Sequence, residues 1–139
     1  LTKCAALDIR AYCGNYNGPN DLKGFKGIIH FPYQWSNLAL FENIQNELIH
    51  FVPSKEFIMD LKGNYAPVPI ISDQNLECAE WYREENKDLF IYFDSWQDLK
   101  NKIETADYEI KNKNIKQFAA THKKTMIARW KEVFEEFNL

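Results

Sequence analysis

The sequence is poor in cysteine and has no long hydrophobic run. Cys4, Cys13 and Cys78 are spread over 139 residues and form no CxxC pair. A sparse, odd set of cysteines excludes a disulfide framework and indicates a reducing, cytoplasmic compartment. The absence of any run of about 18 apolar residues argues against a membrane-spanning helix. The longest apolar runs are short enough to be strands.

An excess of basic residues is also missing. Seventeen Lys and Arg face twenty Asp and Glu, which gives a formal charge of −3. A general nucleic-acid binder usually carries a basic excess, so nucleic acid is not an expected partner. Hydrophobic residues make up 45% of the chain, which is ordinary for a globular protein and excludes disorder. The length fits one domain over residues 1–139. Because Leu1 is not a natural start residue, we expect an excised domain or a processed product.

Short apolar segments alternate with helical patterns along the chain. Four segments have the composition of strands: Leu7–Tyr12, Gly27–Phe31, Leu48–Val52 and Asp88–Phe93. Helical patterns cover about Asn37–Glu47 after Ser36, a helix after Ser54 to Lys62, Leu76–Asn86, Trp96–Thr105 after Ser95, and about Asn112–Phe137; Gly63–Asn75 is expected to be an ordered loop over the core. This alternation predicts an α/β, Rossmann-like fold with a parallel sheet of about four to five strands flanked by helices, and a long C-terminal helix.

Residues 30–54 carry the most chemical information, because they show a strand, a tight turn, a helix and a second strand. Ser36, Asn37 and Leu38 would bring free backbone N–H groups to the start of the helix. That end of a helix carries about half a positive charge and suits a phosphate or diphosphate. The Ser36 hydroxyl could bind the same oxygens. A plain helix cap is the alternative, and it is favoured on capping preference alone.

Glu42 lies further along the same helix, among apolar residues. A carboxylate can accept hydrogen bonds from two neighbouring hydroxyls, such as those of a ribose. Without further context, a solvated helix glutamate is the better interpretation.

This stretch resembles the donor-binding, C-terminal half of GT-B-fold glycosyltransferases, which carry a motif of Glu, seven residues and Glu. Residues 41–44 (FENI), followed by 48–54 (LIHFVPS), match its second half. The resemblance implies that Glu42 holds the ribose of a nucleotide-diphosphate sugar, and that Ser36 with the amides of Asn37 and Leu38 holds the diphosphate. The position of the first glutamate is Gln34, which can hydrogen-bond sugar hydroxyls but cannot act as a carboxylate. Glu47 stands where the family often has glycine.

The end of the chain extends the resemblance to roughly residues 7–137. The family's donor domains also end in a strand followed by terminal helices, matched here by 93–96 (FDSW), Leu99, Phe118-Ala119, His122 and 128–130 (ARW). The resemblance implies an enzyme that transfers a sugar to an acceptor hydroxyl, with no metal or other cofactor. It also implies an N-terminal acceptor domain or partner subunit, which would supply the base in inverting members. The catalytic residues are therefore not assigned.

Two alternatives stay open. The chain could be a non-catalytic nucleotide-binding Rossmann-like subunit or an interaction module. Lys123, Lys124, Arg129 and Lys131 form a basic patch that could contact an anionic membrane surface and a lipid-linked acceptor, although the glutamates that follow favour a solvated mixed face.

Other candidate residues have simpler interpretations. Residues 14–18 (GNYNG) match neither GxGxxG nor Walker A and are expected to form a turn. His30 and His50 have no metal-ligand spacing, so core or strand-end histidines with hydrogen bonds are favoured over a metal pair.

Overall fold

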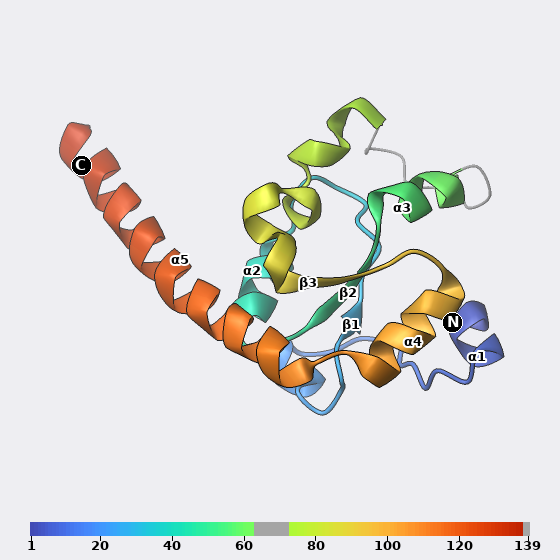
Figure 1. Cartoon of the computed structure of the whole chain (residues 1–139). Coiled ribbons are helices and arrows are strands. Elements are labelled where there is room, and N and C mark those ends of the chain that lie inside the picture. Colours follow the sequence, from blue (N-terminus) through green and yellow to red (C-terminus); the bar gives the residue numbers. More distant parts are fainter. Residues whose placement is uncertain (63–72, 138–139) are drawn as a thin grey trace.

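The computed structural model describes residues 1–62 and 73–137. In chain order the regular elements are α1 (Thr2–Ala6), the 3₁₀ helix η1 (Pro19–Leu22), β1 (Ile28–Ile29), α2 (Leu38–Gln45), β2 (His50–Pro53), α3 (Lys55–Lys62), the 3₁₀ helices η2 (Asp73–Cys78), η3 (Glu80–Tyr82) and η4 (Glu84–Leu89), β3 (Phe90–Phe93), α4 (Trp96–Thr105) and α5 (Tyr108–Glu136). Figure 1 shows their arrangement around a small sheet, from which α5 extends outward.

The described residues form a three-stranded parallel sheet in the order β1-β2-β3. The α/β class, the parallel sheet and the long C-terminal helix are thus confirmed, but the expectation of four to five strands is wrong. Residues 7–12 do not pair with the sheet. They come directly after α1 and include a turn at Asp8, whose φ is +57°. Most of their side chains are exposed. Apolar composition alone cannot form a strand without a partner edge.

Helices and aromatic side chains cover both faces of the sheet. His50 and Phe90 face α2 and η3, where His50 lies edge-on to Phe90. Phe51 and Phe93 face the opposite side, where α3 and α4 contribute Phe57 and other apolar residues. All four residues of β2 are buried, as expected for a central parallel strand covered on both faces. Gly27 permits the close approach of β1, because a Cβ there would lie 2.8 Å from the carbonyl oxygen of Ile49.

Serine caps were predicted for three helices, and two of these caps are found in the structure. The Ser54 hydroxyl accepts a hydrogen bond from the Phe57 amide at 3.2 Å. The Ser95 hydroxyl accepts one from the Asp98 amide at 3.0 Å, while the Asp98 carboxylate accepts one from the Asp94 amide. Both serine caps are confirmed. The α2 cap is Asn37 rather than Ser36.

Two further expectations are corrected in extent. The stretch 76–86 is a series of 3₁₀ turns, not one α-helix. The final helix begins at Tyr108, four residues earlier than expected, because the Asp107 side chain accepts a hydrogen bond from the Ile110 amide. Most of the loop expected over 63–75 lies outside the described residues.

Packing inside the sheet–helix layer should dominate stability. Leu99 on α4 is fully buried, whereas Leu38 on α2 is 94% exposed. We expect Leu99→Ala to lower the free energy of unfolding by about 2–5 kcal/mol, since it removes buried methyl groups and leaves a cavity. Leu38→Ala should change it by less than about 0.5 kcal/mol. Urea denaturation measures both, and equal losses would contradict this packing.

Candidate functional site

The turn between β1 and α2 lies at the carboxyl end of the sheet, where open parallel sheets bind ligands. Residues 33–36 are exposed, and the buried Pro32 precedes them. The Trp35 carbonyl accepts a hydrogen bond from the Glu80 amide at 2.8 Å. This long-range bond ties the middle of the turn to η3 and fixes its position.

Asn37 organises the start of α2. Its side-chain oxygen accepts a hydrogen bond from the Ala39 amide at 2.8 Å, and its side-chain amide donates to the Tyr33 hydroxyl at 3.1 Å. The Asn37 side chain is therefore engaged within the protein. Among the described residues, no partner is found for the backbone N–H groups of Asn37 and Leu38. These two amides can donate to an anion at the positive end of the helix.

The other residues expected in the site lie on the surface around this turn. Gln34, Ser36, Leu38 and Glu42 are all exposed. Leu38 and Glu42 are four residues apart in α2 and so share one face of the helix. Glu42 makes no side-chain hydrogen bond or ion pair with another described residue, so its carboxylate is available to a ligand. Leu40 and Ile44 point into the core instead.

Two aromatic residues at this turn were not among the residues expected in the site. Tyr33 and Trp35 flank Gln34, and both side chains are nearly half exposed. The Tyr33 hydroxyl accepts a hydrogen bond from the Asn37 side chain, and the Trp35 carbonyl accepts one from the Glu80 amide. Two aromatic side chains within a polar turn were the sequence signal that could have identified them, because exposed aromatics on a fixed backbone offer flat contact surfaces at low entropic cost.

Two histidines on the α2 face of the sheet do not form a charged site. His50 is buried, and its Nε2 lies 3.4 Å from the Asn43 side-chain nitrogen. His30 stacks on Trp81 with ring centroids 4.7 Å apart. Burial lowers the pKa of His30 to about 4, and burial together with the nearby His30 lowers the pKa of His50 to about 3. Both rings are thus neutral at pH 7 and add no positive charge to the turn.

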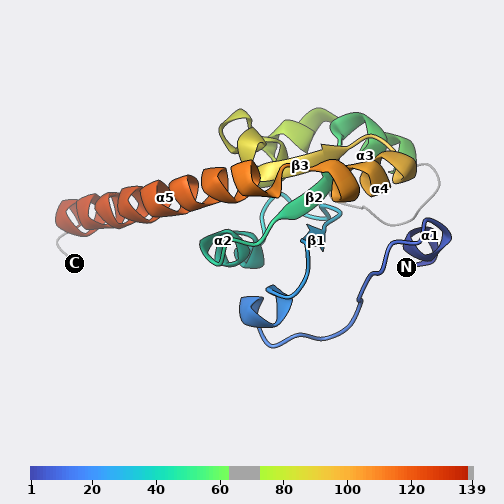
Figure 2. The same ribbon diagram turned by 60° about the horizontal axis from the view of Figure 1, so that its bottom comes forward.

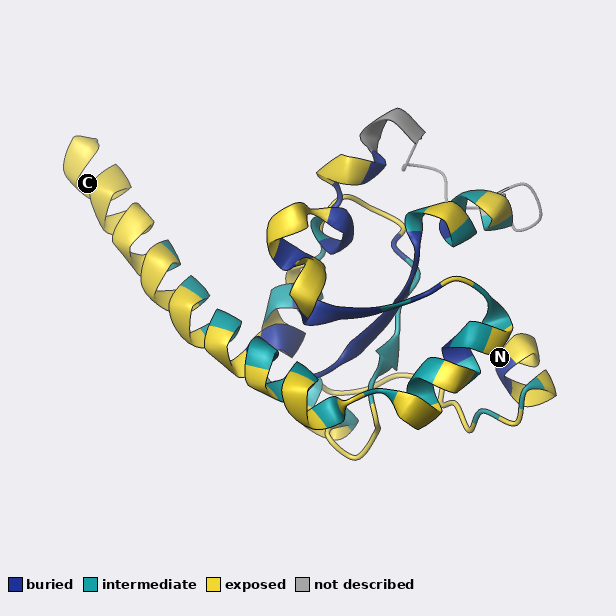
Figure 3. Cartoon of the chain, in the orientation of Figure 1, coloured by how far each residue is buried: buried dark blue, intermediate teal, exposed yellow. Residues whose placement is uncertain are grey.

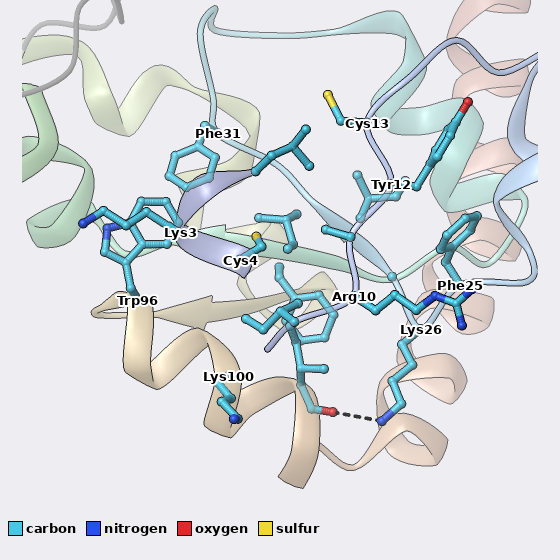
Figure 4. Close-up of a pocket in the computed structure, with 18 of the residues that line it drawn as sticks. Lys3, Cys4, Arg10, Tyr12, Cys13, Phe25, Lys26, Phe31, Trp96 and Lys100 are labelled. Carbon is cyan, nitrogen blue, oxygen red and sulfur yellow. Dashed lines mark hydrogen bonds between the residues drawn. The ribbon is translucent and has the colours of Figure 1, made fainter. Parts of the chain in front are cut away.

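A separate, largely apolar cavity lies on the α3/α4 side of the sheet. It has a volume of about 1230 Å³ and includes Tyr16 and Cys13 of the N-terminal segment in its wall. Figure 4 shows Arg10, Lys26 and Trp96 around it. None of the five residues expected in the site lines this cavity, so the two features are distinct. Within residues 1–62 and 73–137, no group of three or more His, Cys, Asp or Glu side chains is arranged to hold a metal ion.

No family model, curated protein or solved structure matches the chain. None of the helices in the described part of the chain is long and apolar enough to cross a membrane.

The observed cap can be distinguished from the expected one by two substitutions. Asn37→Ala removes the hydrogen bond to the Ala39 amide and should lower the free energy of unfolding by about 1 kcal/mol. Ser36→Ala, one residue earlier, should leave it within about 0.5 kcal/mol of the original. Chemical denaturation of both variants tests the assignment. A larger loss in the free energy of unfolding for Ser36→Ala than for Asn37→Ala would show that Ser36 is the cap.

The buried His50 and the half-buried His30 should make the fold acid-sensitive. Their folded-state pKa values lie below the usual 6.5. Their contribution to the free energy of unfolding is therefore complete above pH 6.5 and falls as the pH drops toward 4. We expect the urea midpoint to decrease between pH 7 and pH 5, before most carboxylates titrate. His50→Asn should flatten this decrease even if it lowers overall stability. His122→Gln, on α5, is the control and should keep it. An unchanged slope in His50→Asn would contradict the burial of a neutral ring.

Proposed function

We propose that this chain is a Rossmann-like donor-binding domain that holds a nucleotide-diphosphate sugar for transfer of the sugar to an acceptor hydroxyl. The observation that carries the proposal is the pair of backbone amides, of Asn37 and Leu38, at the start of α2. They lie beside an exposed turn at the carboxyl end of a parallel sheet, where the helix dipole favours a diphosphate. The resemblance to GT-B glycosyltransferases supplies the nucleotide sugar as the ligand class.

The spacing of Leu38 and Glu42 on α2 indicates how the bound nucleotide would lie along the helix. Glu42 follows Leu38 by four residues, which is about 6 Å along the helix axis. That spacing is close to the separation of a nucleotide's diphosphate from its ribose hydroxyls. A diphosphate on the amides would therefore bring the ribose to the free Glu42 carboxylate, which accepts hydrogen bonds from both hydroxyls. Gln34 and the Ser36 hydroxyl lie on the turn itself and complete the polar surface.

The chemistry of this chain would be orientation and charge stabilisation. The amides stabilise negative charge that develops on the departing diphosphate, and Glu42 fixes the nucleoside so that the anomeric carbon meets the acceptor. Because His30 and His50 are neutral, the positive potential beneath the leaving group does not depend on them and includes that of the α2 terminus. The acceptor and any base that deprotonates it would belong to an acceptor domain or partner subunit, as the resemblance implies.

Removal of the Glu42 carboxylate tests the proposal. Glu42→Ala should weaken the binding of UDP or GDP, whichever the protein binds, by about tenfold or more, since two hydrogen bonds to a charged group are lost. Its exposed position predicts unchanged folding by circular dichroism. Calorimetric titration measures the affinity, and Glu104→Ala on α4 is the matched control for loss of an exposed carboxylate.

The outcomes separate the alternatives. Failure of the unmodified protein to bind any nucleoside diphosphate, or equal affinities in both variants, would refute the site. Nucleotide binding that depends on Glu42, without sugar transfer when an acceptor domain is supplied, would favour the non-catalytic nucleotide-binding subunit.

A further inference from the structure

The outer half of α5 carries an apolar stripe that the body of the protein does not cover. Figures 1 and 2 both show this helix projecting away from the sheet and its other helices. Phe118 and Ala119 are the last α5 residues packed against the core, and His122 stacks on Phe41 at 4.9 Å between ring centroids. Beyond this point the helix is mostly exposed (Figure 3).

The uncovered residues follow the spacing of a helix–helix seam. Ile127, Trp130, Phe134 and Phe137 recur at steps of three, four and three, which places them along one side of the helix. Trp130 is 55% exposed and Phe137 is 64% exposed. The Trp130 and Phe134 rings lie 5.8 Å apart and form the centre of the stripe. Large aromatic side chains gathered in this way mark an interaction surface.

Charge is divided along the same segment. Lys123, Lys124, Arg129 and Lys131 precede Glu132, Glu135 and Glu136. Lys124, Lys131 and Glu135 lie along the same edge of the stripe, by their positions on the helix. A second helix in the same direction would place basic residues beside basic ones. A second copy in the opposite direction would place Lys123 and Lys124 of each helix beside the acidic end of the other, with Arg129 and Lys131 near the two-fold axis.

We propose that the outer half of α5 pairs with α5 of a second copy of this chain in an antiparallel, two-fold symmetric dimer. With the two-fold axis beside Trp130, the two Trp130 rings meet, and Ile127 of each copy lies opposite Phe134 of the other. Lys124 of each copy then lies opposite Glu135 of the other. The arrangement is isologous, so one surface patch satisfies both copies.

The shape of the protein permits this pairing. Because α5 projects from the body (Figure 2), its outer half is open to a second helix. In this register Phe137 of one copy lies beside Lys123 of the other, next to the stacked Phe41 and His122 rings. The apolar tip of each helix would thus extend the aromatic cluster at the base of the other. This inference is independent of the nucleotide site.

The mass of the intact chain in solution tests the proposal. Sedimentation equilibrium over about 1–200 μM should show a concentration-dependent dimer. Trp130→Glu should raise the dissociation constant by about a hundredfold or more, since a central aromatic anchor is replaced by a charge. Trp130 is exposed, so circular dichroism should report an intact body, with any loss of helical signal confined to the outer half of α5. A protein that is monomeric throughout this range would overturn the proposal and leave the stripe to a different partner.

Charge reversal tests the direction of pairing. Lys124→Glu and Glu135→Lys should each weaken the dimer by about tenfold, because each creates two like-charge contacts across the axis. The double variant K124E/E135K should recover the original affinity, and an equal mixture of the two single variants should form a heterodimer. Lys113→Glu, on the part of α5 beside the body, is the control and should have no effect. Single variants that dimerise normally, or a double variant that does not recover, would overturn the antiparallel arrangement.

Discussion

The pairing of β2 with both neighbouring strands is the interaction on which the rest of this structure depends. β2 is the central strand, and its register with β1 and β3 places the ends of all three strands on one edge of the sheet. The turn into α2, the start of α3 and the start of α4 therefore lie on that same edge. Only four residues form the strand, so its stability rests on burial from both faces more than on ladder length.

Burial of a histidine in that strand has an electrostatic consequence. His50 occupies a position that the sheet, α2 and η3 enclose, and the ring remains neutral there because burial disfavours its charged form. His30 is in the same situation beside Trp81. The imidazoles thus act as flat packing groups. The α2 terminus contributes positive potential at the carboxyl edge of the sheet through N–H groups that are fixed by backbone geometry and do not titrate.

The sequence predicts features that are decided locally and fails where distant residues decide. The Ser54 and Ser95 caps were predictable because each serine lies three residues before the amide that it binds. Ser36 and Asn37 are adjacent and both suit a cap, so the local pattern does not choose between them; in the structure Asn37 is the cap and also bonds Tyr33. The strand expected at residues 7–12 needed a partner edge. The Trp35–Glu80 bond and the His30–Trp81 stack join segments more than 40 residues apart, so no local pattern predicts them.

The exposed stripe of α5 bears on the stability of the outer half of the helix. The helix has 29 residues, which corresponds to about 44 Å, and its first half is held by contacts such as the hydrogen bonds from the Lys111 side chain to the Asp88 and Phe90 carbonyls. The outer half has no such support from the described body. A helical segment of this length is only marginally stable in water by itself, since most helical stability in proteins comes from packing of an apolar face. Antiparallel pairing would provide that packing, so the same contacts that join two copies would also stabilise the helix that makes them.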